Sequence, residues 1–172
     1  MYPIWGLRAV QKPIPLARGR VDGELVALAA KILVVDDDVE TRLLLGEELL
    51  DLGHEAVYAA DGVQALSLVR REQPDLILLD LRLPDIDRSG VAGGDGFSVL
   101  ERLRGIEDVA SIPVIVFSGM RSPQAEERAR LLGAREFVLK SFTGDDLVEA
   151  IARVLEGHTS LPTSGRFDPI PV

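Results

Sequence analysis

Short apolar runs alternate along most of the chain with longer segments that have helical spacing. Five short runs, bounded by polar or turn-forming residues, have the length of strands buried in a sheet; they are residues 32–35, 55–59, 76–79, 114–117 and 136–139. Segments with helical periodicity follow them, at about 39–51, 62–71, 97–104, 123–132 and 144–155. This alternation predicts an α/β domain whose parallel sheet is covered by helices on both faces.

Capping residues stand where several of these helices are expected to begin and end. Asp61 and Gln64 have the spacing of a capping box. Ser122 followed by Pro123 is typical of a helix start, and Gly133 of a helix end. In the first helix we expect Leu43, Leu44 and Leu50 to face inward.

The two ends of the chain lack such a pattern. Residues 1–30 are predicted to be a largely irregular N-terminal extension, because residues 1–23 contain several prolines and glycines and no apolar period. A short helix is predicted over residues 24–30. Residues 158–172, which include three prolines, are predicted to be a C-terminal tail.

Charge and composition exclude several classes of function. Residues 1–30 carry four basic and two acidic residues, a charge of +2. Because the net charge of the whole chain is −9, residues 31–172 carry a charge of −11. An acidic body argues against direct nucleic-acid binding. The chain has no cysteine, so it forms neither a disulfide nor a thiolate metal site. No apolar run reaches the roughly 18 residues needed to span a bilayer, and no signal peptide is evident, so we expect a cytoplasmic protein without membrane insertion.

Acidic residues follow two of the predicted strands directly. Asp36, Asp37 and Asp38 come after the first run, and Asp80 comes after residues 76–79. In open α/β sheets the ligand crevice lies at the carboxyl ends of the strands. Carboxylates that converge there repel one another, which implies either a bound metal ion or a proton held between the carboxylates. Oxygen ligands of this kind suit Mg²⁺. An aspartate at the end of a strand can instead be the N-cap of the following helix. For Asp38 the N-cap and a place in the acidic site fit the sequence equally well.

Two more polar residues follow the last two strands. Ser118 comes after residues 114–117, and Lys140 comes after residues 136–139. A hydroxyl and an ammonium at the same edge as the acidic cluster suit the oxygens of a phosphoryl group. His54 and His158 have no partner at a useful spacing, and we assign neither to a metal or to catalysis.

The connection after Asp80 is longer than such loops usually are. About 15 residues separate Leu81 from Phe97, against roughly 2–6 in most strand-to-helix loops. Residues 88–95 are rich in glycine and match neither a P-loop nor a dinucleotide-binding fingerprint. We interpret them as a tolerated surface insertion that is mobile without a partner. The alternative is a lid or a partner-contacting loop, because the segment begins beside the proposed site.

Four motifs together resemble the receiver domain of two-component response regulators. They are Lys-Ile-Leu-Val-Val-Asp-Asp-Asp (31–38), Asp-Leu-Arg-Leu-Pro-Asp (80–85), Val-Ile-Val-Phe-Ser-Gly (114–119) and Phe-Val-Leu-Lys (137–140). The resemblance covers residues 31–157 and implies a flavodoxin-like, doubly wound sheet of five parallel strands in the order 2-1-3-4-5. It resembles most the single-domain, chemotaxis-regulator-like receivers.

The resemblance implies a role for each site residue. Asp80 would be the phosphoacceptor, with Lys140 and Ser118 contacting the phosphoryl group. Mg²⁺ would be bound by Asp37, Asp80 and the backbone carbonyl of Arg82, with Asp36 acting through water. Ser118 and Phe137 would change position on activation.

The implied partners are a sensor histidine kinase or a histidine phosphotransfer protein, and a downstream protein target. Homodimerisation is left open. The resemblance implies a signalling domain and no enzyme beyond its own phosphorylation and dephosphorylation.

Three departures from the family pattern qualify these expectations. Lys140 is followed by Ser141 in place of the usual proline, which leaves open whether this bond is cis. The segment around residues 88–95 is inserted before the third helix. We expect only a tail and no output domain after the last helix, which suggests a single-domain regulator that signals by contact or a phosphate relay or sink.

Two other functions fit some of the same residues. A receiver-like docking module that acts without phosphorylation would use the fold alone. A haloacid-dehalogenase-type phosphatase also uses an aspartate after the first strand, but its Asp-x-Asp-x-Thr/Val motif meets Glu40 at the last position here. It would also leave Asp80 without a role.

Overall fold

The computed structural model describes residues 18–21, 24–27, 29–84, 95–119, 122–140 and 144–159. Its main element is a five-stranded parallel sheet with the strand order β4-β3-β5-β6-β7. The strands are β3 (Lys31–Val35), β4 (Glu55–Ala59), β5 (Leu76–Leu79), β6 (Val114–Ser118) and β7 (Glu136–Leu139). Counted from β3, this is the predicted order 2-1-3-4-5, and the expected flavodoxin-like fold is confirmed.

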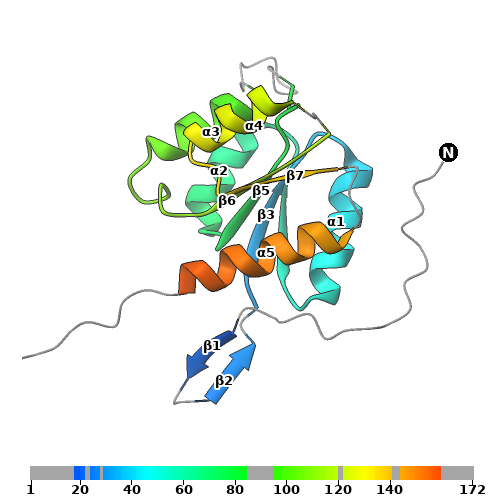
Figure 1. Ribbon diagram of the computed structural model, residues 1–172, viewed down its shortest axis with the longest axis vertical. Coiled ribbons are helices and arrows are strands. Elements are labelled where there is room, and N and C mark those ends of the chain that lie inside the picture. The colour runs from blue at the N-terminus through cyan, green and yellow to red at the C-terminus, as the bar shows by residue number, and fades with distance from the viewer. Residues whose placement is uncertain are drawn as a thin grey trace, which may run out of the picture.

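Five helices cover the sheet on both faces, as the alternating pattern predicted. They are α1 (Val39–Asp51), α2 (Gly62–Glu72), α3 (Gly96–Arg104), α4 (Pro123–Leu131) and α5 (Gly144–Thr159). Figure 1 shows α2, α3 and α4 on one face and α1 and α5 on the other. Among the described residues, no helix is long and apolar enough to cross a membrane.

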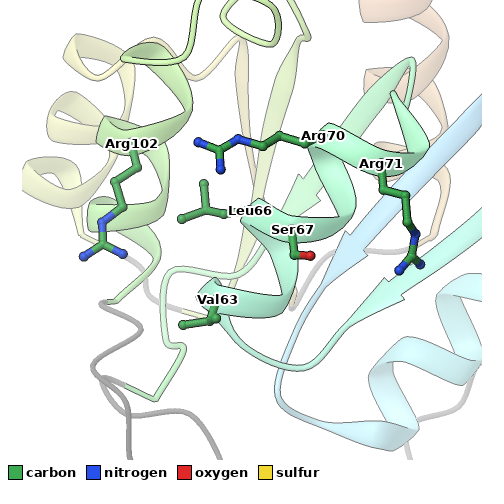
Figure 2. A pocket seen from close by; sticks show the side chains of 6 residues that line it. All are labelled: Val63, Leu66, Ser67, Arg70, Arg71 and Arg102. Atoms are coloured by element: carbon green, nitrogen blue, oxygen red, sulfur yellow. The ribbon is translucent and has the colours of Figure 1, made fainter.

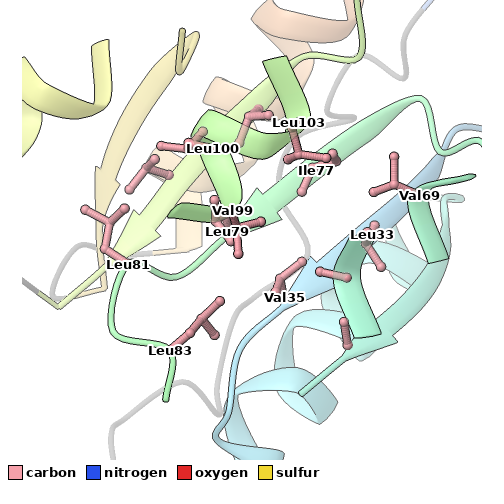
Figure 3. Packing of buried hydrophobic residues seen from close by; sticks show 14 of the residues in the cluster. Leu33, Val35, Val69, Ile77, Leu79, Leu81, Leu83, Val99, Leu100 and Leu103 are labelled. Carbon is pink, nitrogen blue, oxygen red and sulfur yellow. The ribbon is translucent and has the colours of Figure 1, made fainter. Parts of the chain in front are cut away.

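The strands contribute side chains to two separate hydrophobic cores, one on each face of the sheet, because successive side chains point to opposite faces. In β3, Leu33 and Val35 join the cluster beneath α2, α3 and α4, whereas Ile32 and Val34 join the cluster beneath α1 and α5. Figure 3 shows the first cluster. Full burial of one such aliphatic side chain contributes roughly 1.5–3 kcal/mol. The continuous apolar runs therefore reflect strands that are buried on both faces.

The predicted caps are present. The backbone N–H of Gln64 donates to Asp61 Oδ1 at 2.8 Å, and the Gln64 side chain in turn accepts from the N–H of Ala60 at 2.6 Å. Ser122 accepts from the N–H of Ala125 at the start of α4. Gly133, beyond the end of α4, has a φ of 93°, a conformation that glycine adopts without strain.

The predicted orientation of the first helix was wrong. Leu43, Leu44 and Leu50 are 60%, 48% and 72% exposed, while Leu45 and Leu49 are buried against the sheet. The buried pair is spaced four residues apart and therefore lies on one face of the helix. Leucines occupy so many positions of α1 that the apolar period does not select a single face.

The prediction for the N-terminal extension was wrong in two described places. Residues 18–21 and 24–27 form strands β1 (Arg18–Val21) and β2 (Glu24–Ala27), which pair antiparallel in a sheet of their own. The predicted irregular lead and short helix are therefore replaced there by a hairpin. The sequence does contain its signal, because the Asp-Gly dipeptide at 22–23 is a strong hairpin turn former.

Several predicted features lie outside the described residues. These are most of the N-terminal extension, nearly all of the inserted segment 88–95, and the C-terminal tail beyond Thr159. Helix α5 ends at Thr159 instead of near Leu155.

Candidate functional site

Four polar side chains from four neighbouring strands meet at the carboxyl edge of the sheet. Asp36 follows β3, Asp80 follows β5, Ser118 ends β6 and Lys140 follows β7. Strands β3 and β5 are paired directly, so their terminal aspartates are brought side by side. Asp36, Asp80 and Ser118 are only 2%, 3% and 0% exposed, unusually low values for polar residues. The parallel sheet thus gathers the predicted residues into one buried polar site.

Both oxygens of the Asp80 carboxylate accept hydrogen bonds. Oδ1 accepts from the Ser118 hydroxyl at 2.9 Å and from the backbone N–H of Arg82 at 3.1 Å. Oδ2 accepts from the Lys140 ammonium at 2.5 Å. Asp80 is therefore held by Ser118 and Lys140, the two side chains that were predicted to contact the phosphoryl group. These hydrogen bonds explain how so polar a group is buried.

Lys140 joins the two buried aspartates. Its Nζ lies 2.6 Å from Asp36 Oδ2 as well as 2.5 Å from Asp80 Oδ2, and its side chain is 19% exposed. Burial by itself lowers the pKa of the Lys140 ammonium, but hydrogen bonds and charge interactions with Asp36 and Asp80 outweigh it and raise the pKa above the ordinary value. Lys140 therefore supplies one fixed positive charge between two carboxylates.

Asp36 is held from the other side by the start of α1. Its Oδ1 accepts from the backbone N–H of Asp38 at 3.0 Å, and its backbone carbonyl accepts from the guanidinium of Arg42. Burial raises the pKa of the Asp36 carboxyl, and the nearby Asp80 charge adds to this effect, while Lys140 opposes it. Sequence reasoning missed Arg42, because an interaction with a backbone carbonyl leaves no motif.

The predicted metal-binding aspartates form a compact group. One carboxylate oxygen each of Asp36, Asp37 and Asp80 lies within 4.8 Å of the others, and Asp37 is exposed to solvent. Two ligands of one Mg²⁺ lie at most about 4.2 Å apart, so these oxygens are near enough to share an ion directly or through one of its waters. Oxygen-only ligands and an open side facing solvent fit Mg²⁺.

Asp38, the third residue of the acidic run, is the N-cap of α1. Its Oδ2 accepts from the backbone N–H of Thr41 at 3.0 Å and from the Thr41 hydroxyl at 2.6 Å. These hydrogen bonds lower the pKa of the Asp38 carboxyl. The N-cap alternative is therefore the right one for this residue.

The remaining predicted site residues are only partly tested. Phe137 is half-buried at the edge of the core beneath α2, α3 and α4. The metal-binding role of the Arg82 carbonyl and the switch role of Phe137 stay predictions. Ser141 lies outside the described residues, and so does the geometry of the Lys140–Ser141 bond.

His54 has a structural role that the sequence did not indicate. It is 6% exposed, and its Nδ1 accepts a hydrogen bond from the backbone N–H of Ala30 at 3.2 Å. Burial lowers the pKa of the imidazole, partly offset by Asp75. The neutral ring thus connects the start of β3 to the turn after α1.

The amino-acid sequence is similar to those of known proteins. Residues 32–152 match the family model described as the response regulator receiver domain. The chain is 34% identical over 125 residues to the sporulation initiation phosphotransferase F of Bacillus subtilis (strain 168), an alignment that covers 73% of this chain and 93% of that protein. It is 33% identical over 141 residues to the probable transcriptional regulator ycf27 of Porphyridium aerugineum, covering 78% of this chain and 54% of that protein. The chain spans about half the length of several of the curated relatives that it matches.

Solved structures show the same fold. The chain is 33% identical to NtrX from Brucella abortus with a TM-score of 0.67, over 76% of this chain and 28% of that one. It is 28% identical to the N-terminal receiver domain of RstA from Klebsiella pneumoniae with a TM-score of 0.64, over 73% of this chain and 97% of that one. With its strand order, its acidic cluster and a family match over most of its length, the chain belongs to the receiver domain family of two-component response regulators.

Proposed function

We propose that Asp80 accepts a phosphoryl group from the phosphohistidine of a sensor histidine kinase or a histidine phosphotransfer protein. The phosphorylated chain then signals through protein contacts that depend on this modification. The observation that carries the proposal is the double contact of Lys140 with Asp36 and Asp80 at the carboxyl edge of the sheet. A cation that is held against an acceptor carboxylate is what a transferred phosphoryl group requires.

The transfer is a displacement at phosphorus. A carboxylate oxygen of Asp80 attacks, an O–P bond forms, and the N–P bond of the phosphohistidine breaks with its electron pair going to the imidazole. Such transfers pass through a loose transition state, so positioning and charge stabilisation account for most of the catalysis. Ser118 and Arg82 N–H, which bond Oδ1, orient the carboxylate for this attack. Lys140 neutralises charge on the transferred group.

The acidic cluster favours a requirement for Mg²⁺. Asp37, Asp80 and the Arg82 carbonyl would hold the ion, with Asp36 bound through water. When bound, Mg²⁺ supplies positive charge to the phosphoryl oxygens. Lys140 would leave Asp36 and follow the phosphoryl group onto Asp80.

The proposed response follows from the new charge on Asp80. The acylphosphate adds nearly two negative charges, and the Ser118 hydroxyl that now donates to Asp80 would donate to a phosphoryl oxygen instead. Movement of Ser118 would shift the end of β6, which pairs with β7. Phe137 of β7 would then change its rotamer, which would give the surface around β7 and α4 two states. Phosphorylation shifts their balance only by the difference in free energy that it makes between them.

Protein partners are favoured over other classes. Some relatives are named as transcriptional regulators, one of them as DNA-binding, but the acidic charge of this chain disfavours direct contact with nucleic acid. We propose a protein target, with homodimerisation as one form of the contact. The chain has no proposed enzymatic role beyond its own phosphorylation and dephosphorylation.

Incubation with acetyl phosphate, with Mg²⁺ or with a chelator, tests the proposal by intact-mass measurement. We expect one phosphoryl group per chain, formed only with Mg²⁺. No gain in mass under either condition would support a docking module that acts without phosphorylation. Multiple turnovers of a small phosphomonoester would instead support the phosphatase.

A further inference from the structure

A shallow groove lies between α2 and α3, and none of the residues that line it belongs to the acidic site. It has a volume of about 550 Å³ and is lined by Val63, Leu66, Ser67, Arg70, Arg71 and Arg102. Val63 and Leu66 are half-buried and form an apolar floor, while the arginines are exposed. Figure 2 shows the Arg70 side chain extending over Leu66 toward the helix that carries Arg102, whereas Arg71 points to the opposite side of α2.

The arginines differ in whether a carboxylate neutralises them. Arg71 pairs with Glu72 at 2.8 Å. Within the described part of the chain, no acidic side chain pairs with Arg70 or Arg102. The chain has a net charge of −9, but the rim of this groove carries two guanidinium groups that no carboxylate of the described residues neutralises. The local charge of the groove is therefore positive. The groove therefore favours an anionic occupant.

Helix dipoles explain only part of this arrangement. Arg70 and Arg102 stand in the last turns of α2 and α3, where a cation is stabilised by the helix dipole. Arg104, in the same turn of α3, is used inside the fold, because its guanidinium donates to the carbonyl of Leu131 at 3.0 Å. The dipole accounts for the charge, but it does not account for an apolar floor left open between the two arginines.

The shape of the groove favours a polypeptide over a small anion. The eight residues from Val63 to Arg70 span about 10 Å of helix, the length of two turns. All its charged lining residues are exposed, and among the described residues that line it no buried polar group could hold a free phosphate. An apolar floor with cationic sides complements a helix that carries apolar residues on one face and carboxylates beside them.

We propose that the groove between α2 and α3 binds an acidic, amphipathic segment of a partner protein. Apolar side chains of that segment pack on Val63 and Leu66, and its carboxylates pair with Arg70 and Arg102. The contact goes beyond the proposed phosphotransfer, because none of its residues belongs to the acidic site.

Selection from a displayed library of random peptides tests the proposal on the full chain. The library is selected on wild type and counter-selected on the double variant Arg70→Glu/Arg102→Glu. We expect enriched peptides with acidic residues beside apolar residues at helical spacing. Each single charge reversal should weaken the binding of a selected peptide by about fivefold or more, the scale of a lost and reversed surface ion pair.

Arg135→Glu is the matched control, because Arg135 is an exposed arginine outside the groove. It should leave peptide affinity unchanged, and circular dichroism should show that the two single variants, the double variant and Arg135→Glu are all folded. Failure to enrich acidic amphipathic peptides, or equal loss of affinity in Arg135→Glu, would overturn the proposal. Displacement of the peptides by millimolar inorganic phosphate would also overturn it, since it would mark a simple anion site.

Discussion

Gly96 lies so close to the backbone of Asp80 that a Cβ placed on it would be 2.4 Å from the Asp80 carbonyl oxygen and 2.5 Å from Leu81 Cα. The N–H of Gly96 also donates to the carbonyl of Leu81 at 3.2 Å. The start of α3 is thereby held directly against the backbone of residues 80–81, which includes the proposed phosphoacceptor Asp80. A side chain at residue 96 has no room, because the Asp80 carbonyl oxygen and Leu81 Cα are backbone atoms and cannot rotate away.

Gly96→Ala is therefore expected to destabilise the fold by about 1–3 kcal/mol, the usual cost of overpacking. Gly157→Ala in α5 is the control, since a Cβ there meets nothing within 4 Å. That change should stabilise the helix by roughly 0.5–1 kcal/mol. Urea unfolding measures both, and equal effects of the two substitutions would contradict the close approach of Gly96 to Asp80.

Much of the site was predictable because parallel strands align their carboxyl ends. A polar residue straight after a buried run must lie at that edge, so Asp36, Asp80, Ser118 and Lys140 could be placed together from their positions in the sequence. What could not be predicted is which pairs touch. The simultaneous contact of Lys140 with both aspartates depends on the conformation of a long side chain, and no sequence spacing encodes that.

The errors in the fold have physical causes that are specific to their segments. In α1, leucines occupy several faces, and the packing of Leu45 and Leu49 on the sheet decides the orientation. In the extension, the prediction rested on the absence of an apolar period and did not use the Asp-Gly dipeptide at 22–23. The Asp38 alternatives were left open because a capping aspartate and a metal-binding aspartate look alike in sequence.

Removal of the Lys140 charge should destabilise the chain most when Mg²⁺ is absent. Lys140→Met keeps much of the aliphatic stem but leaves two buried carboxylates without their cation. We expect a loss of about 1–3 kcal/mol, less than the 3–5 kcal/mol of a fully buried pair, because the ammonium keeps some contact with solvent. Unfolding is measured in a chelator and in Mg²⁺.

Mg²⁺ should restore more stability to Lys140→Met than to wild type, since the ion replaces the missing charge. Lys31→Met is the control, because the Lys31–Glu72 pair is more exposed and longer, at 3.4 Å. Its loss should be below about 1 kcal/mol and independent of Mg²⁺. If Mg²⁺ stabilised wild type, Lys140→Met and Lys31→Met equally, the proposed role of Lys140 as the cation of the acidic site would be contradicted.

His54 should make the fold sensitive to mild acid. Its pKa is lowered by burial, so the unfolded chain binds more protons than the folded one as pH falls below the ordinary histidine pKa near 6.5. The stabilisation is fully present above that pKa and declines as the pH falls toward the lower pKa of the folded state. Protonation of Nδ1 also removes the acceptor for the N–H of Ala30.

His54→Asn keeps a hydrogen-bond acceptor but does not titrate. Between about pH 7.5 and 5.5, the free energy of unfolding should fall more steeply in wild type than in His54→Asn. Parallel pH profiles for the two proteins would show that another group causes the acid sensitivity.

The inserted segment can be removed without loss of the α3 cap. Asp95 accepts from the N–H and the hydroxyl of Ser98, both at 2.9 Å. Deletion of residues 88–95 brings Asp87 directly before Gly96, so an aspartate remains at the N-cap position. We expect this variant to retain the stability and Mg²⁺ binding of wild type.

Deletion of residues 87–95 is the matched comparison, since it places Ile86 before Gly96. It should be less stable than the shorter deletion by about 1 kcal/mol, the typical value of an N-cap. Equal stability would show that the cap contributes nothing here. The lifetime of the phosphoryl group in the first variant also separates a tolerated insertion, which leaves it unchanged, from a lid, which changes it several-fold.

The identity of the phosphoacceptor is tested most directly by intact-mass measurement of variants after incubation with acetyl phosphate and Mg²⁺. Wild type and Asp38→Asn should each gain one phosphoryl group, because Asp38 only caps α1. Asp80→Asn should gain none, since the amide is not a nucleophile. Labelling of Asp80→Asn at the level of wild type would place the acceptor on another residue and contradict the central claim.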